Sequence, residues 1–268
     1  MKVVTLPRCM AAFIVAGALA AFAVEAAEIR VVSSGGFAEA YKALAPEYEH
    51  ESGNAVVTGW GPSMGDTPQA VPNRLARGEP IDVVIMVGYA LGDLIEQGKV
   101  IPDSRVDLAE SGIGLVVRAG APKPDISTVD ALKRTLLAAK SVAYSDSASG
   151  VYIANEMFKK MGIEAEMAGK ARMIPAEPVG AVVARGEAEV GFQQISELKP
   201  IKGIELVGPI PSEVQKFTIF SAGVVTASKD PEDAKGLIRF LASPEAAPAI
   251  EESGLEPMVA AAPAAAVH

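Results

Sequence analysis

Two serine-rich loops are the places in this chain where chemistry is expected. Ser33-Ser34-Gly35-Gly36 and the segment 145–150 (Ser-Asp-Ser-Ala-Ser-Gly) each follow a short apolar run and precede a predicted helix. A helix start presents unpaired backbone N–H donors and a positive dipole end, and small side chains let an anion approach closely. One such loop is typical of ordinary capping and turn chemistry. Two in matching positions predict a shared anionic ligand. The candidate contacts are Ser33, Ser34, Ser147 and Ser149.

The sequence leaves few groups able to act as a general base. His50 lies near the exposed end of the first predicted helix and His268 lies in the C-terminal tail, so histidine is not expected in the site. Two acids remain as candidate catalytic groups, Glu177 at a predicted helix start and Asp66 in the loop 61–68. Either could serve if burial raised its pKa. The alternatives are charge complementarity to the helix start for Glu177 and an Asx turn for Asp66.

Four further side chains are candidates for ligand contact. Tyr89 and Tyr152 could donate hydrogen bonds to a carboxylate, or they could pack with their hydroxyls at the rim of the core. Arg74 could hold a planar carboxylate through two parallel hydrogen bonds, or it could lie along a helix surface. Met64 falls near the predicted ligand side, although methionines commonly fill gaps in a core.

The elements that must position these residues alternate between strand and helix. Short apolar runs predict strands at 29–33, 54–60, 81–87, 113–118, 142–144 and 190–194. Helical spacing of apolar residues predicts helices at 36–51, 151–160 and 231–241. Strands that alternate with helices indicate an open α/β sheet, the fold class expected here. Such sheets bind ligands beyond the carboxyl ends of their strands, where the serine loops fall.

The N-terminus predicts export. Lys2 and Arg8 precede an apolar stretch from Cys9 to Val24, and small residues between Ala23 and Ala27 offer cleavage sites. We therefore expect a signal peptide at residues 1–26 and a periplasmic protein. A membrane anchor is the alternative, but the apolar stretch is short for spanning a bilayer. Cys9 is the single cysteine, so the exported chain has no disulfide, thiolate nucleophile or cysteine metal site.

Charge and motifs exclude several functions. The net charge is −9, or −10 without Lys2, Arg8 and Glu25, and basic stripes interleaved with aromatics are missing, so nucleic acid is not an expected partner. Gly169-Lys170 is not followed by the hydroxyl residue of a phosphate-binding loop. A serine nucleophile would need a nearby histidine. We expect no metal and no cofactor.

The residues resemble the type II periplasmic solute-binding proteins, in particular the molybdate-binding-like branch. The matching segments are the strand that enters the first serine loop, 77–83, 149–152, 184–192 and 241–246. The resemblance implies two α/β lobes joined by two crossing segments, with a ligand cleft that closes by hinge motion. It assigns 27–112 and 221–258 to the first lobe and 113–220 to the second. The alanine- and proline-rich segment 259–268 is expected to be a disordered tail.

The same resemblance implies a set of site residues. The oxyanion site of that family corresponds by position to Ser33 or Ser34, Ser63, Ser149 and the backbone near Ala176 and Glu177. Where molybdate binders commonly have a tyrosine, this chain has Gln193-Gln194. Glutamine and arginine suit planar carboxylates, so Gln194 joins the candidate contacts and an organic polycarboxylate is expected in place of molybdate.

The segments 33–37, 59–65 and 72–76 look most like a sub-branch of this fold that includes periplasmic aconitate isomerases. The resemblance implies a cofactor-free enzyme, expected to be a monomer, that interconverts cis- and trans-aconitate by an allylic proton shift. The alternative is a capture subunit that delivers a tricarboxylate, molybdate or another oxyanion to the permease of an ABC transporter. An isomerase and a receptor could share every anchoring residue and differ in a single base.

Overall fold

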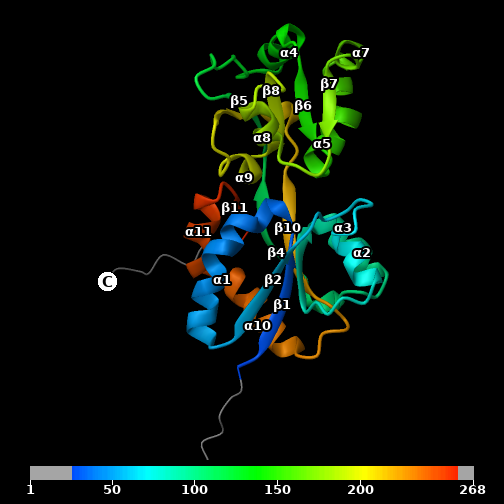
Figure 1. Cartoon of the computed structure of the whole chain (residues 1–268), viewed down its shortest axis with the longest axis vertical. Coiled ribbons are helices and arrows are strands. Elements are labelled where there is room, and N and C mark those ends of the chain that lie inside the picture. Colours follow the sequence, from blue (N-terminus) through cyan, green and yellow to red (C-terminus); the bar gives the residue numbers. More distant parts are fainter. Residues whose placement is uncertain (1–25, 259–268) are drawn as a thin grey trace, which may run out of the picture.

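The computed structural model describes residues 26–258, which form two α/β lobes stacked along the long axis of the molecule (Figure 1). The predicted signal peptide, apart from its last residue, and the predicted disordered tail 259–268 lie outside the described residues. Between residues 26 and 258, no helix combines the length and the apolar character needed to cross a bilayer.

Lobe 1 is built on a six-stranded sheet of order β11-β4-β10-β3-β1-β2, in which β1, β2 and β3 run parallel. β10 runs antiparallel to both of its neighbours. The strands are β1 (Glu28–Ser33), β2 (Ala55–Trp60), β3 (Val83–Val87), β4 (Val106–Ser111), β10 (Thr218–Val224) and β11 (Glu256–Pro257). All five residues of β3 are buried, which fits a parallel strand covered on both faces.

Lobe 2 is built on a five-stranded sheet of order β7-β6-β8-β5-β9, in which β6, β7 and β8 run parallel. β5 lies antiparallel to β8 and β9. The strands are β5 (Ile113–Arg118), β6 (Val142–Ser145), β7 (Ala171–Ile174), β8 (Val190–Gln194) and β9 (Ile204–Pro209). Each lobe thus holds a parallel group of three strands with an antiparallel strand beside it.

Helices connect the strands and cover the sheets. In lobe 1 they are α1 (Ala38–Ser52), α2 (Val71–Ala76), α3 (Gly88–Glu96), α10 (Pro231–Leu241) and α11 (Ala247–Glu252). In lobe 2 they are α4 (Val129–Ala138), α5 (Ala148–Tyr152), α6 (Phe158–Lys160), α7 (Glu164–Met167), α8 (Val179–Ala184) and α9 (Ile195–Leu198). A π-helical turn, Ile153–Met157, joins α5 to α6. Short 3-10 turns occur at Gly35–Phe37, Pro102–Ser104, Ser212–Val214 and Pro244–Ala246.

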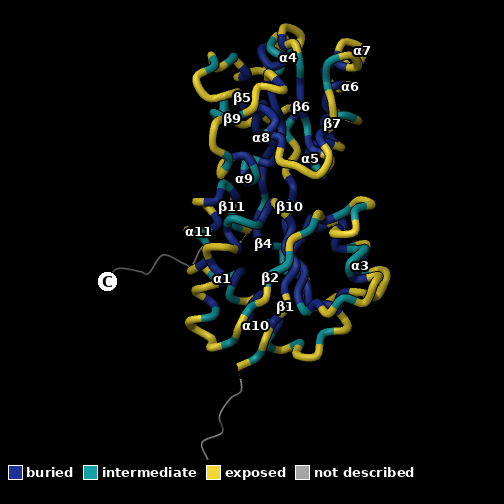
Figure 2. Tube along the Cα trace, viewed as in Figure 1, coloured by how far each residue is buried: buried dark blue, intermediate teal, exposed yellow. Residues whose placement is uncertain are grey.

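Burial of apolar side chains organises the two lobes separately. One cluster of buried residues fills lobe 1 from β1 to α11, and two clusters lie on the two sides of the lobe 2 sheet. Figure 2 shows the central strands of both lobes buried and the outer loops exposed. At about 25 cal/mol for each Å² of apolar surface removed from water, this burial is the main stabilising contribution in a chain without disulfides.

Two short connections join the lobes. The first is Gly112, between β4 and β5, and the second is the segment 210–217, between β9 and β10. Because β10 begins at Thr218, the chain returns to the lobe 1 sheet three residues before the boundary expected at 220/221. Gln215 ties the second connection to the first, since its Oε1 accepts the N–H of Ile113 at 2.8 Å and its Nε2 donates to the Ile113 carbonyl at 3.0 Å.

Candidate functional site

The carboxyl ends of the parallel strands of each lobe are directed toward the other lobe (Figure 1). In lobe 1 these ends lead into the first serine loop after β1 and into the N-terminus of α3 after β3. In lobe 2 they lead into the second serine loop after β6 and into α9 after β8. We call the region bounded by residues 33–37, residues 145–150 and α9 the interlobe junction.

Three buried serines form the lobe 1 half of the junction. Ser33, Ser34 and Ser63 are exposed by 0%, 4% and 6% respectively. The Ser34 N–H donates to the Ile85 carbonyl at 2.8 Å, which ties the first serine loop to β3. Ser63 Oγ accepts the Val87 N–H at 2.9 Å, so its own proton is free to donate. Ser34 Oγ is buried without a partner, and a ligand oxygen would satisfy it.

The lobe 2 half is a chain of hydroxyls in the second serine loop. Ser145 Oγ lies 2.9 Å from Ser147 Oγ and 3.0 Å from Ser149 Oγ. Ser149 is buried, and Ser147 is half-buried at the start of α5. A Cβ at position 150 would lie 1.6 Å from the Ser145 carbonyl oxygen, so only glycine allows the chain to turn here. The tight turn brings the three hydroxyls together.

A strained residue adjoins the second serine loop. Ala176 has a φ of 59°, the left-handed conformation that costs an L-residue about 1–2 kcal/mol. Its N–H donates to Asp146 Oδ2 at 3.1 Å. This bond holds the backbone near Ala176 against the second serine loop.

Direct contacts between the lobes close the junction. Ala148, in the second serine loop, packs against the core cluster of lobe 1. The Glu197 carboxylate reaches Gly35, where an added Cβ would lie 2.7 Å from Glu197 Oε1. Lys199 Nζ donates to the Glu252 carbonyl of lobe 1. The second serine loop, α9 and Lys199 therefore each contact lobe 1.

Gln194 and Tyr152 are committed to structural contacts. In the amide orientation that satisfies both of its ends, Gln194 donates to the Ser111 carbonyl at 2.8 Å and accepts from Thr218 Oγ1 at 2.7 Å. It thereby links the two segments that cross between the lobes. Tyr152 is 3% exposed in the lobe 2 core, and its hydroxyl donates to the Val214 carbonyl at 2.8 Å.

The remaining candidates lie on or near the surface. Arg74 pairs with Glu79 and donates from Nη1 to the Trp60 carbonyl at 3.1 Å, so its guanidinium is engaged within lobe 1. This pairing raises the pKa of Arg74 and lowers that of Glu79. Met64 and Tyr89 lie together, with the Tyr89 hydroxyl 3.4 Å from the Met64 sulfur.

The two acids predicted as catalytic are both exposed. Glu177 accepts two hydrogen bonds of 3.1 Å from the guanidinium of Arg185, and its side chain is 42% exposed. Asp66 lies exposed in the loop between β2 and α2. Neither carboxylate is therefore buried in the interlobe junction.

The family model described as bacterial extracellular solute-binding protein matches residues 29–256. The chain belongs to this family. It is 57% identical over 232 residues to an aconitate isomerase of Pseudomonas sp, with 87% of this chain and 88% of that protein covered. It is 26% identical over 245 residues to the molybdate-binding protein ModA of Azotobacter vinelandii, covering 88% and 92% of the two chains.

The fold of this solute-binding protein is also that of known structures. The periplasmic molybdate-binding protein of Azotobacter vinelandii superposes with a TM-score of 0.68 at 19% identity, covering 85% of this chain and 98% of the other. The sulfate-binding protein SubI of Mycobacterium tuberculosis superposes with a TM-score of 0.66 at 19% identity, covering 87% of each chain. The predicted two-lobed α/β fold and the predicted molybdate-binding-like branch are confirmed.

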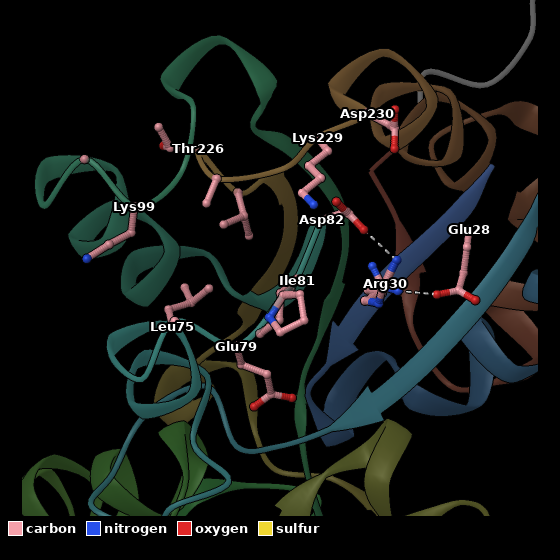
Figure 3. Close-up of a pocket in the computed structure, with 15 residues that line it drawn as sticks. Glu28, Arg30, Leu75, Glu79, Ile81, Asp82, Lys99, Thr226, Lys229 and Asp230 are labelled. Carbon is pink, nitrogen blue, oxygen red and sulfur yellow. Dashed lines mark hydrogen bonds and ion pairs between the residues drawn. The ribbon is translucent and has the colours of Figure 1, made fainter.

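A cavity of about 530 Å³ lies in lobe 1 at the amino ends of β1 and β3, away from the serine loops. Figure 3 shows Arg30 in this cavity between Glu28 and Asp82. The Arg30 guanidinium pairs with Glu28, and the Asp82 carboxylate accepts the backbone N–H of Arg30 at 2.8 Å and the hydroxyl of Ser228 at 2.7 Å. None of the predicted site residues lines it. The interlobe junction is therefore the better candidate site.

One functional candidate escaped sequence reasoning. Glu197 lies in the first turn of α9, within a segment, Ile195-Ser196-Glu197-Leu198, that reads as a surface helix. The residue as a whole is half-buried, but its carboxylate lies inside the junction against Gly35. Burial raises the pKa of Glu197 to about 7, a hydrogen bond from Gln193 opposes this rise, and the negative charge of Asp146 adds to it. In the sequence, the polar pair Gln193-Gln194 at the end of an apolar strand was the indication that buried polar groups gather next to α9.

Proposed function

We propose that this solute-binding protein is a periplasmic enzyme that interconverts cis- and trans-aconitate at the interlobe junction. The observation that carries the proposal is the 57% identity to an aconitate isomerase over 87% of this chain. Export and a monomeric state belong to the same proposal. The buried hydroxyls of both lobes support it, since they offer donors to the carboxylates of a small polyanion.

The reaction needs only binding groups and a proton carrier. A base removes a proton from the methylene carbon next to a carboxylate, and the resulting charge is delocalised over three carbons and their carboxylates. Return of a proton at the other end of the allyl unit completes the double-bond shift. Fixed hydroxyl and N–H donors around the substrate carboxylates stabilise the charge as it develops. We assign the anchoring of those carboxylates to Ser34, Ser63 and Ser149.

A second function has specific support. Identity of 26% to a molybdate-binding protein, together with the family itself, favours a receptor that captures an oxyanion or tricarboxylate for an ABC transporter. Such a receptor would bind without turnover.

Proton NMR of the purified protein with cis-aconitate in D₂O separates the two functions. Isomerisation predicts growth of the vinyl signal of trans-aconitate well above a control without protein, with deuterium entering the methylene carbon. Absence of conversion would refute the isomerase. If aconitate, citrate or molybdate then stabilises the protein against heat in a saturable way, the receptor function is supported, because a ligand at 100 times its Kd adds about 2.7 kcal/mol.

A further inference from the structure

The junction places one carboxylate where it contacts both lobes. Glu197 belongs to α9 of lobe 2, and its Oε1 approaches the position that a side chain of Gly35 in lobe 1 would occupy. Gly35 directly follows Ser34, whose buried hydroxyl has no hydrogen-bond partner. A carboxylate and an unsatisfied donor thus lie at adjacent residues of the first serine loop. The unpartnered hydroxyl points to a ligand independently of Glu197.

Gln193 faces this carboxylate and can donate to it. Gln193 Oε1 accepts the Val179 N–H at 2.9 Å, and Gln193 is 6% exposed. The oxygen end of the amide is therefore engaged with α8, which leaves the NH₂ end to donate to Glu197. This arrangement suits Gln193 to position the carboxylate without touching a substrate itself.

The charges near Glu197 suit proton transfer in both directions. Burial and the Asp146 carboxylate raise the pKa of Glu197, and the Gln193 donor lowers it, with a balance at about 7. Lys199 directly follows α9, and its ammonium group donates to the Glu252 carbonyl. An acid with a pKa near neutrality can take a proton and return it within one cycle.

We propose that Glu197 is the acid–base group of the allylic proton shift and that Gln193 positions it, an inference that rests on the proposed function. The ionised Glu197 carboxylate takes a proton from the substrate methylene, so that the C–H bond breaks and an O–H bond forms. The electron pair of the C–H bond spreads over the allyl unit and its carboxylates. The O–H bond then breaks and the proton moves to the far allyl carbon, which restores the Glu197 carboxylate. No oxidant, reductant or second reactant is needed.

The decisive variant is Glu197→Gln, which keeps the shape of the side chain and removes its basicity. We expect turnover in the NMR assay to fall on the order of 10²–10⁴-fold. Calorimetric titration with cis-aconitate should give a Kd close to that of the wild type. The matched control is Glu96→Gln, which changes an exposed glutamate at the end of α3 and should leave both quantities unchanged. Glu197→Asp keeps the carboxyl group on a shorter side chain, and we expect partial activity from it.

Gln193→Leu tests whether Gln193 positions Glu197. The quantity measured is the pH dependence of kcat/KM, which general damage to the fold would not shift. Loss of the donor to the carboxylate raises the pKa of Glu197, so the rising limb of kcat/KM against pH should shift to higher pH. A lower rate with an unshifted limb would contradict the role of Gln193.

The outcomes separate the two proposals. Wild-type turnover that survives in a folded Glu197→Gln variant would overturn the role of Glu197 and leave the isomerase function standing. Absence of wild-type turnover would overturn the isomerase function and, with it, the acid–base role. If Glu197→Gln does not fold, full activity of Glu197→Asp at an unchanged pH profile would argue against the proposal.

Discussion

The buried carboxylate of Glu197 should couple the stability of the protein to pH. Its pKa rises from 4.5 to about 7 in the folded protein. Between these two pH values the folded chain holds a proton that the unfolded chain releases. The stabilising contribution is therefore complete below pH 4.5 and is lost as the pH rises to 7. At about 1.4 kcal/mol for each tenfold change in proton affinity, the loss amounts to about 3 kcal/mol.

Glu197→Gln removes this titration. Above pH 7 the wild type carries the cost of a buried charge and the variant does not, so the variant should be the more stable by about 2 kcal/mol once its altered hydrogen bond to Gln193 is counted. Near pH 4.5 the two proteins should be almost equally stable.

Urea unfolding followed by circular dichroism at several pH values between 4.5 and 8 measures the difference in the free energy of unfolding between the wild type and Glu197→Gln. The exposed control Glu96→Gln should stay within about 0.5 kcal/mol of the wild type throughout. Parallel stability curves for the wild type and Glu197→Gln would refute the reasoning, because they would show that the carboxylate does not titrate inside the junction.

Three further predictions concern stability. Gly150→Ala should destabilise the protein by on the order of 3 kcal/mol in urea unfolding, because its Cβ would lie 1.6 Å from the Ser145 carbonyl oxygen; a loss below about 1 kcal/mol would contradict that clash. Ala176→Gly should raise the Tm by a few degrees, since glycine adopts a φ of 59° without strain, and a lower Tm would show that the strain is absent. Tyr152→Phe should cost about 1–2 kcal/mol in urea unfolding through the loss of the bond to Val214, and a neutral effect would mean that the bond contributes nothing.

The fold was predictable because apolar periodicity is a local property of the chain. The predicted strand at 81–87 corresponds to β3 at Val83–Val87, and the predicted helix at 36–51 corresponds to α1 at Ala38–Ser52, preceded by the 3-10 turn Gly35–Phe37. Ser33 and Ser34 were likewise found from a local pattern, since their burial follows from their place at the carboxyl end of β1.

Contacts that form only when the chain folds decided the rest. Glu177 stands at the head of a helix as predicted, yet Arg185, eight residues later, binds its carboxylate at the surface. Glu197 looks like a solvated acid in the sequence, and only the approach of Gly35 from the other lobe encloses it. Arg74 pairs with Glu79, five residues later in lobe 1. A charge pattern along the chain does not show which acid the other lobe will cover.

The strand order of lobe 1 also has a consequence for how the chain matures. β10 lies between β4 and β3, although more than a hundred residues of lobe 2 separate it from β4 in the sequence. During synthesis from the N-terminus, the lobe 2 sheet becomes complete once residue 209 has emerged, whereas the lobe 1 sheet stays divided until Thr218–Val224 arrive. A chain that ends at residue 217 should therefore contain one protease-resistant lobe and one unfolded lobe. The part of the protein made first is the part that folds last.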